Sequence, residues 1–339
     1  IEEVQFSIIQ NRGCFGGCNF CAITMHQGRR VTARSKKSIV DEAIEITEQE
    51  NFKGYIHDIG GPTANFRQPS CAKQMKDGMC AGKKCLAPNP CNNLIVDHRE
   101  YLEILREVRA LPKVKKVFIR SGIRYDYLIN DRNDEFFKEL INHHISGQLK
   151  VAPEHCAPET LKYMGKPPIE AYNKFSEKFY KLTKQAGKKQ YLVPYLMSSH
   201  PGSTLEDAVI LAKYLYDNKI RPEQVQDFYP TPGTVSTCMF YTGLDPYTLK
   251  SVYVAKLPEE KAMQRALLQY YEPRNREKVV EALRKTGNDN LIPVLVGGGA
   301  ATIRNKAQGA VLWTKKEPTL TKTKLESKPK PYRKKSSRK

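Results

Sequence analysis

A chain of 339 residues with a net charge of +20, 40% hydrophobic residues and 27% charged residues has the composition of a soluble globular protein. It has no apolar run near the ~18 residues of a membrane span, and its first apolar stretch lacks a preceding basic region, so we expect neither a membrane helix nor a signal peptide. Its nine cysteines are clustered, which favours metal binding in a reducing cytoplasm over a secreted disulfide framework.

Strand-like and helix-like segments alternate along most of the chain. This alternation predicts an α/β fold with a parallel sheet, in which chemistry lies at the C-terminal ends of the strands. Ser38 is the expected N-cap of the first helix. Strands are predicted at residues 4–9, 55–59, 117–120, 149–152, 190–196 and 224–229. Helices are predicted at residues 38–50, 99–110, 134–145, 158–164, 169–186, 204–218, 258–271 and 275–285.

Composition divides the chain into three predicted parts. Residues 1–245 form the α/β core, interrupted at about residues 63–93 by a cysteine-rich insertion without clear periodicity. Residues 246–313 form a helical extension. Residues 314–339 contain eleven basic and two acidic residues with few apolar ones, which predicts a disordered tail. Such a tail either attracts RNA or another polyanion, or only increases solubility.

The strongest chemical signal is a cysteine motif directly after the first predicted strand. Cys14, Cys18 and Cys21 lie within the sequence CFGGCNFC. Gly16 and Gly17 let the backbone curl, so that three thiolates can wrap one cubane iron–sulfur cluster. No fourth cysteine follows nearby, which leaves one iron open to a small molecule. A zinc knuckle is the alternative, and it fits poorly because structural zinc sites usually take four protein ligands.

A Cys-x3-Cys-x-aromatic-Cys motif after a first strand resembles the signature of the radical S-adenosylmethionine (SAM) superfamily. The resemblance implies a partial (β/α)6 TIM-like barrel and a [4Fe–4S] cluster on the three cysteines. It implies that SAM binds the open iron and is reductively cleaved to a 5′-deoxyadenosyl radical. An external reductant of the flavodoxin or ferredoxin type is also implied. The substrate stays open, with RNA and protein as candidate classes through similarity to methylthiotransferases.

The same resemblance assigns cofactor contacts at the ends of later strands. Gly60 and Gly61 correspond to a glycine pair whose backbone approaches the amino group of the cofactor. This chain has Pro62 where many relatives place an acidic residue. Ser121 and Glu154 follow the third and fourth strands, and are the expected contacts to the ribose and carboxylate of SAM.

Three further segments narrow the resemblance to the YgiQ family: SGIRYD at 121–126, APEH at 152–155 and SHPG at 199–202. That family carries an additional N-terminal domain, so we expect the chain to be a piece of a longer protein. His155 and His200 lie in these segments and are secondary candidates for the site.

Four later cysteines, Cys71, Cys80, Cys85 and Cys91, form a second set inside the insertion. Their spacings match no short zinc-finger pattern, so zinc, an auxiliary cluster, redox disulfides and free thiols all stay open. Two rival functions stay open as well. One is an electron-transfer or sensing protein that does not cleave SAM, and the other is a zinc-containing module that binds RNA in a salt-sensitive way.

Overall fold

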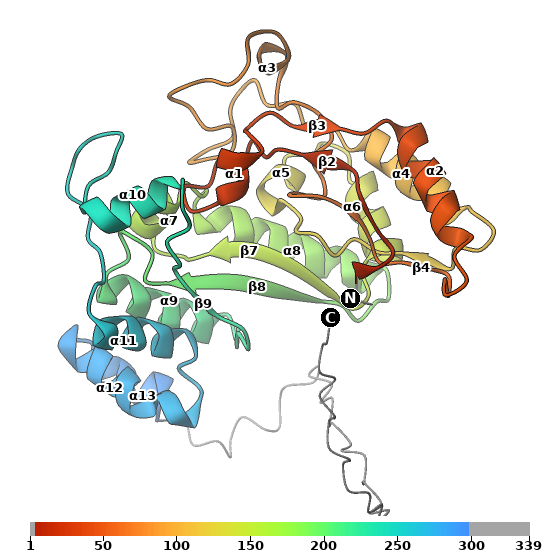
Figure 1. Cartoon of the computed structure of the whole chain (residues 1–339). Coiled ribbons are helices and arrows are strands. Elements are labelled where there is room, and N and C mark those ends of the chain that lie inside the picture. Colours follow the sequence, from red (N-terminus) through yellow and green to blue (C-terminus); the bar gives the residue numbers. More distant parts are fainter. Residues whose placement is uncertain (1–3, 298–339) are drawn as a thin grey trace, which may run out of the picture. The chain divides into compact units, whose positions relative to one another are not determined.

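The computed structural model describes residues 4–297, and parallel strands form its centre (Figure 1). Each of the strand regions expected from the sequence forms, and each pairs in parallel, which confirms the α/β prediction. The second region is divided at His57 into two short strands. The parallel ladders are β1 (Ser7–Ile9) with β5 (Asp58–Gly60), β4 (Tyr55–Ile56) with β6 (Lys116–Val117), and β7 (Gln148–Glu154) with β8 (Tyr191–Ser198) and β9 (Gln226–Asp227).

A small antiparallel pair that the sequence pattern does not predict closes the first cysteine loop. β2 (Asn11–Arg12) pairs with β3 (Thr32–Ala33), and the short helix α1 (Ala22–His26) lies between them in sequence. Gly13 has a φ of 80°, and a β-carbon there would lie 2.1 Å from the carbonyl oxygen of Arg30. Only glycine therefore fits where the chain enters the loop.

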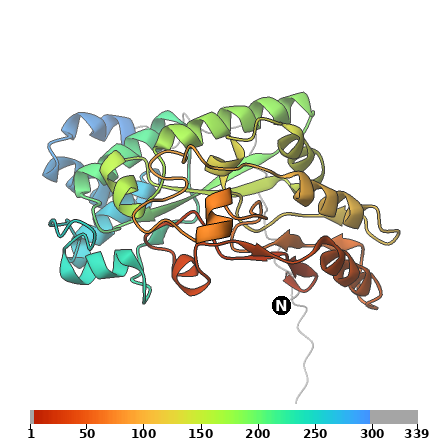
Figure 2. The ribbon, with the colours of Figure 1, turned by 90° about the horizontal axis from the view of Figure 1, so that it is seen from above.

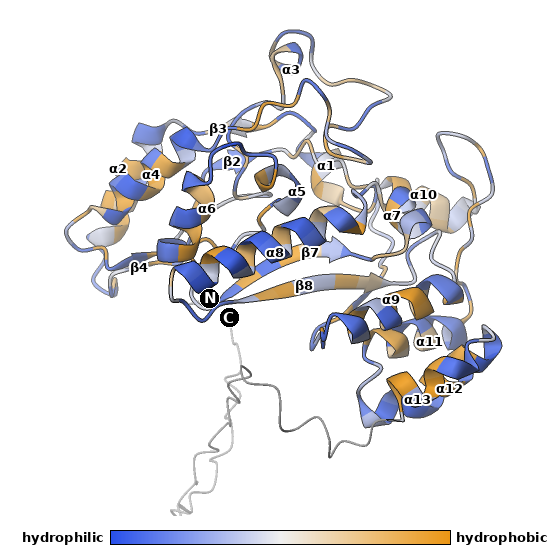
Figure 3. Ribbon diagram, turned by 180° about the vertical axis from the view of Figure 1, so that it is seen from behind, coloured by the Kyte–Doolittle hydropathy of each residue, from blue (hydrophilic) through white to orange (hydrophobic). Residues whose placement is uncertain are grey.

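Helices follow the strands and pack against them. Figures 1 and 3 show α8 on one face of β7 and β8, with apolar residues along both strands. Figures 1 and 2 place α2 and α4 at one end of the described unit and α11 to α13 at the other. The helices of the core are α2 (Lys36–Thr47), α3 (Ala72–Asp77), α4 (Arg99–Arg109), α5 (Tyr125–Leu128), α6 (Glu135–Glu139), α7 (Pro158–Met164), α8 (Ile169–Gln185), α9 (Leu205–Asp217) and α10 (Val235–Thr242).

Two details differ from the sequence prediction. The N-cap of α2 is Ser35 and not Ser38, because the Ser35 side chain accepts a hydrogen bond from the Ser38 backbone N–H. The helix expected at 134–145 is α-helical only over α6 and continues as the π-helical turn η2 (Leu140–His144). The wider turn places His144 inward, where it is fully buried.

The two larger hydrophobic clusters of residues 4–297 hold these layers together. The larger one joins the first strands to α2, α4, α6 and α8 through residues such as Ile59, Ile104 and Phe175. The second joins α9 to the C-terminal helices through Leu211 and Leu267. These C-terminal elements are α11 (Pro258–Leu268), η3 (Pro273–Asn275), α12 (Arg276–Lys285), η4 (Asp289–Leu291) and α13 (Ile292–Leu295).

Within the expected helical extension, residues 246–257 contain no helix, and the helical elements begin at Pro258. The extension as a separate part stays a prediction. Residues 298–313 of that extension and the predicted tail at 314–339 lie outside the described residues. The domain boundaries at 245 and 313 stay predictions. Within residues 4–297, no helix is both long enough and apolar enough to cross a membrane.

Candidate active site

The first cysteine loop opens into a cavity at the C-terminal ends of the parallel strands. Cys14, Cys18 and Cys21 line this cavity of about 290 Å³, together with Thr63 after β5 and Glu154 at the end of β7. Parallel strands present their C-terminal ends at one edge, which explains why residues distant in sequence meet there. The structure therefore brings together the three predicted cluster ligands and one predicted cofactor contact.

The three thiols differ in their surroundings. Cys14 is buried, and its sulfur lies 3.4 Å from the hydroxyl of Thr63. Cys18 and Cys21 are half-buried. Burial and the nearby Cys18 raise the pKa of Cys21, so a metal or a positive charge is needed to hold it as a thiolate.

Arg124 supplies a positive charge beside Cys18. Its Nη1 donates a hydrogen bond to the sulfur of Cys18 at 3.2 Å. Its Nε and Nη2 bind the buried carboxylate of Asp126 at 2.8 and 2.6 Å. A β-carbon on Gly16 would lie 2.6 Å from Nη1 and 3.2 Å from the sulfur of Cys14. Gly16 therefore makes room for the guanidinium beside the thiols.

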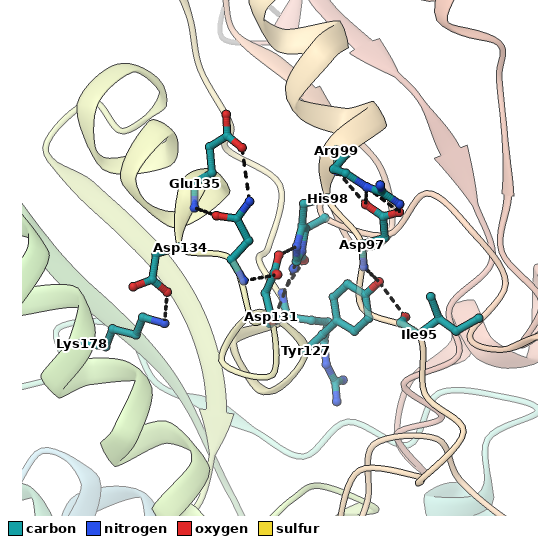
Figure 4. Close-up of polar contacts among 12 residues, drawn as sticks. Ile95, Asp97, His98, Arg99, Tyr127, Asp131, Asp134, Glu135 and Lys178 are labelled. Atoms are coloured by element: carbon teal, nitrogen blue, oxygen red, sulfur yellow. Dashed lines mark hydrogen bonds and ion pairs between the residues drawn. The ribbon is translucent and has the colours of Figure 1, made fainter.

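A buried chain of hydrogen bonds fixes the backbone of Arg124. Asn65 accepts from the Arg124 backbone N–H at 2.9 Å and donates to its carbonyl oxygen at 3.3 Å. The same amide nitrogen lies 3.2 Å from Nε2 of His98, and Nδ1 of His98 lies 2.6 Å from Asp131 (Figure 4). The network runs from the first cysteine loop to a second surface cavity lined by His98 and Asp131.

Glu154 occupies an unusual position in this cavity. Its φ of 71° lies in the left-handed region, next to a bulge in the pairing of β7 with β8. Strained non-glycine backbone and bulges occur often at functional sites. Burial raises the pKa of Glu154, although Lys166 and Arg124 act in the opposite direction. Among the described residues, no side chain or backbone group donates a hydrogen bond to its carboxylate, which leaves it available to a ligand.

The other predicted cofactor contacts meet beside the cavity. The Gly61 backbone N–H donates to the hydroxyl of Ser121 at 3.3 Å, and that hydroxyl donates to Asp58. A β-carbon on Gly60 would lie 2.0 Å from the same hydroxyl. In residues 4–297, the cavity is lined by Pro62 and Thr63 rather than by these three residues. Their predicted roles at the cofactor stay predictions.

The two histidine candidates are buried and bonded inside the protein. Nδ1 of His155 accepts from the Ala157 backbone N–H at 3.0 Å. His200 lies 2.7 Å from both the carbonyl oxygen of Pro201 and the hydroxyl of Ser236. Burial lowers the pKa of each histidine to about 3. Both are therefore neutral at physiological pH and serve the packing around the site.

Residues with clear roles in the cavity were not singled out from the sequence. Arg124 and Asp126 lie within the SGIRYD segment, which the sequence analysis used only for family resemblance. The guanidinium of Arg124 lies beside Cys18, and Asp126, in the first turn of α5, binds that guanidinium. Lys166, whose Nζ donates to the Ala152 carbonyl oxygen at 2.5 Å, follows α7 and carries no sequence signal.

The four later cysteines also meet. Cys71, Cys80, Cys85 and Cys91 line a separate cavity of about 230 Å³ in the insertion. Within residues 4–297, no three His, Cys, Asp or Glu side chains lie close enough together to bind a single metal ion. Each cysteine set therefore lines a cavity of its own.

Comparison with known proteins decides the family. A family model described as the radical SAM superfamily matches residues 8–215, which include the first cysteine loop and Glu154. The chain belongs to the radical SAM superfamily. The expected membership of the radical SAM superfamily is confirmed. A second model, described as a domain of unknown function (DUF3362), matches residues 223–303 of this radical SAM protein.

Curated relatives of this radical SAM protein are UPF0313 proteins, in agreement with the expected likeness to the YgiQ family. A UPF0313 protein of Clostridium perfringens is 62% identical over 306 residues, which cover 90% of this chain and 46% of the relative. One of Clostridium botulinum is 57% identical over 292 residues, which cover 86% of this chain and 46% of the relative. The chain thus spans about half the length of the curated relatives it matches.

A solved structure supports the fold of this radical SAM protein. The cobalamin-dependent S-adenosylmethionine radical enzyme OxsB, with aqua-cobalamin bound, matches with a TM-score of 0.51 and 10% sequence identity. The match covers 84% of this chain and 50% of that chain. Similarity at this level of identity concerns the fold alone.

Proposed function

We propose that this protein binds a [4Fe–4S] cluster through Cys14, Cys18 and Cys21 and cleaves SAM reductively to a 5′-deoxyadenosyl radical. The observation that carries the proposal is the shared cavity, in which three thiols meet Glu154 at the C-terminal ends of the strands. The bound cluster and SAM would supply the electron and the radical. The protein binds, orients and shields them.

The donor set and its surroundings fit such a cluster. Three thiols are present without a fourth cysteine at this cavity, and Arg124 donates to one of them. Hydrogen bonds to cluster sulfurs are among the features that set reduction potential. The buried carboxylate of Glu154 has acceptor capacity for a hydroxyl or amino group of SAM.

Other residues of the cavity would exclude water. Ile123, Tyr125 and Val151 line it and are buried. Lys166 is also buried, with its Nζ 5.5 Å from the centre of the Tyr125 ring. An apolar wall of this kind protects a reactive species from side reactions with solvent.

An external reductant of the flavodoxin or ferredoxin type and a cytoplasmic location belong to the same proposal. RNA and protein remain the candidate substrate classes. Superfamily membership favours this enzyme over an electron-transfer protein that leaves SAM intact, and over a zinc-containing RNA-binding module. A candidate based on zinc also fits the first cavity poorly, because three thiols are fewer than a structural zinc site uses.

Electron paramagnetic resonance (EPR) of the reduced protein tests this proposal. The protein is purified anaerobically, reconstituted with iron and sulfide, and measured with and without SAM. We expect a [4Fe–4S] signal that shifts when SAM is added, and that the Cys18→Ala variant loses. The Cys238→Ala variant, which changes an exposed cysteine outside both cavities, should keep it. A wild-type protein that binds zinc and takes up no iron would contradict the proposal.

A further inference from the structure

The cysteine-rich insertion builds a second thiol-lined cavity. Cys71 directly precedes α3, and Cys80, Cys85 and Cys91 follow on an irregular segment. All four line the same cavity of about 230 Å³. A segment with little regular structure thus brings four thiols to one cavity. Binding of a metal centre there would stabilise the fold of such a segment.

Basic residues surround this second cavity. Lys73, Lys83 and Lys84 line it together with the cysteines. Arg29, from the first cysteine loop, donates to the carbonyl oxygen of Cys80 at 3.2 Å and to that of Lys83 at 2.6 Å. A metal centre held by four thiolates carries net negative charge, and cations around it offset that charge.

The sulfur of Cys85 lies in a setting suited to a cluster. It is 3.2 Å from the hydroxyl of Ser70, and the Cys91 backbone N–H donates to the Cys85 carbonyl oxygen at 2.9 Å. Cys85 also packs against the apolar group that contains Cys14 and Phe66. Hydrogen bonds to sulfur and a dry surrounding are the means by which a protein sets the reduction potential of a cluster.

A direct contact joins the two cysteine sets. Lys84 lies in sequence next to Cys85, and its Nζ donates to Oδ1 of Asn19 at 2.6 Å. Asn19 is the neighbour of Cys18. The path from one set to the other therefore crosses one hydrogen bond between adjacent chain segments.

The size of the second cavity favours an iron–sulfur cluster over a zinc ion. A zinc ion would draw four sulfurs around one point, because Zn–S bonds are only about 2.3 Å long. Here the four thiols line one cavity of about 230 Å³, which has room for more than a single ion. A cubane distributes its outer thiolates over four irons and so needs sulfurs around a larger space.

We propose that Cys71, Cys80, Cys85 and Cys91 bind a second [4Fe–4S] cluster. The protein ligates each of its irons, so this cluster has no open position for SAM. Its chemistry is electron transfer rather than cofactor cleavage. The site stands on its own residues, and only its partnership with the first cluster rests on the proposed function.

Iron and sulfide analysis of the intact, anaerobically reconstituted protein tests the site. Two cubane clusters give about eight irons per chain in the wild type. The triple variant Cys14→Ala/Cys18→Ala/Cys21→Ala should keep about four irons, with an EPR signal that does not respond to SAM. The double variant Cys85→Ser/Cys91→Ser should also keep about four, with the SAM-responsive signal intact. Cys238→Ser is the matched control and should keep all of them.

The outcomes distinguish this inference from the proposed function. A triple variant that folds, as judged by circular dichroism, but holds no iron would overturn the second site, as would stoichiometric zinc in it. A wild type that holds only about four irons, all of them SAM-responsive and all lost in the triple variant, would sink the second cluster and leave the function standing. Should the triple variant fail to fold, the single variant Cys91→Ser decides. Loss of about four of the wild-type irons supports the second cluster, and an unchanged iron content overturns it.

Discussion

Arg124 joins the first cysteine loop to the strand ends through side chain and backbone together. Its guanidinium contacts Cys18 and Asp126, and its backbone is held by Asn65 from the insertion. The side chain is almost fully buried, as is that of its partner Asp126. A buried charge pair of this kind has its largest effect when one member is removed.

We therefore expect Arg124→Gln to act on both stability and the cluster. Leaving Asp126 buried without a partner should cost about 3–5 kcal/mol of unfolding free energy. Loss of the hydrogen bond to Cys18 should lower iron retention or activity roughly 10–100-fold. Urea unfolding and iron analysis of the reconstituted protein measure the two effects.

A double variant separates the two effects of Arg124. Arg124→Gln/Asp126→Asn removes both charges, and we expect it to recover most of the lost stability while the cluster defect stays. Arg132→Gln, at an exposed arginine of the same segment, is the control. Equal iron retention in the wild type and the double variant would show that Arg124 acts only on folding.

At the scale of elements, the start of α9 is fixed by a capping box. The Thr204 side chain accepts from the Asp207 backbone N–H at 3.1 Å, and Asp207 accepts from the Thr204 backbone N–H at 3.0 Å. We expect Thr204→Ala to lower the unfolding free energy by about 1 kcal/mol. Thr204→Ser keeps the hydroxyl and should stay within about 0.5 kcal/mol of the wild type. Chemical denaturation of both variants checks the difference, and equal losses would refute the cap.

The π-helical turn η2 makes stability depend on pH through His144. Burial lowers the pKa of His144 to about 4, while its Nδ1 lies 2.8 Å from the carbonyl oxygen of Val117. The unfolded chain binds this proton near the ordinary pKa of about 6.5, and the folded protein does so only near 4. Stability therefore falls as pH falls from about 6.5 towards 4, by about 3 kcal/mol for this residue.

Removing the imidazole should weaken that pH dependence. We expect His144→Gln to lose less unfolding free energy than the wild type between pH 7 and 4.5, by about 2–3 kcal/mol. The exposed His26→Gln variant should retain the wild-type pH dependence. Urea titrations at the two pH values measure the change, and parallel losses in the wild type and His144→Gln would contradict it.

The sequence predicts long elements well, because their apolar residues repeat over several turns. It predicts short strands and helix ends poorly, because these depend on only a few residues. Helix α8 has seventeen residues with a clear apolar face, and its bounds agree with the prediction within one residue. The strands β2 and β3 have two residues each, too few for any period. Ser35 and Ser38 are equally good caps by residue type, and only the backbone geometry selects Ser35.

The candidate site also contains residues that the local sequence predicts and residues that it does not. The cysteine motif singles out Cys14, Cys18 and Cys21 as candidate ligands from their spacing, because residues so close in sequence can be grouped without knowledge of the fold. Arg124 and Lys166 come from segments distant in sequence from that loop, and their place beside the thiols depends on tertiary packing. Without an assigned register between strands, no pattern of residue types could have placed them there.

At the scale of the whole molecule, residues 4–297 combine a parallel α/β core with an insertion that contacts the first cysteine loop. Lys84 and Arg29 connect the two across their contact. The matched family region at 8–215 contains both cysteine sets. We propose that this arrangement binds SAM at a cluster and cleaves it.

The most direct test of that claim is the amount of 5′-deoxyadenosine formed from SAM by the reconstituted, anaerobic protein after reduction with dithionite. We predict formation of this product by the wild type and by Cys238→Ala, and its loss in Cys18→Ala with SAM left intact. A wild type that holds the reduced cluster and forms no 5′-deoxyadenosine with an added reductant would contradict SAM cleavage by this protein.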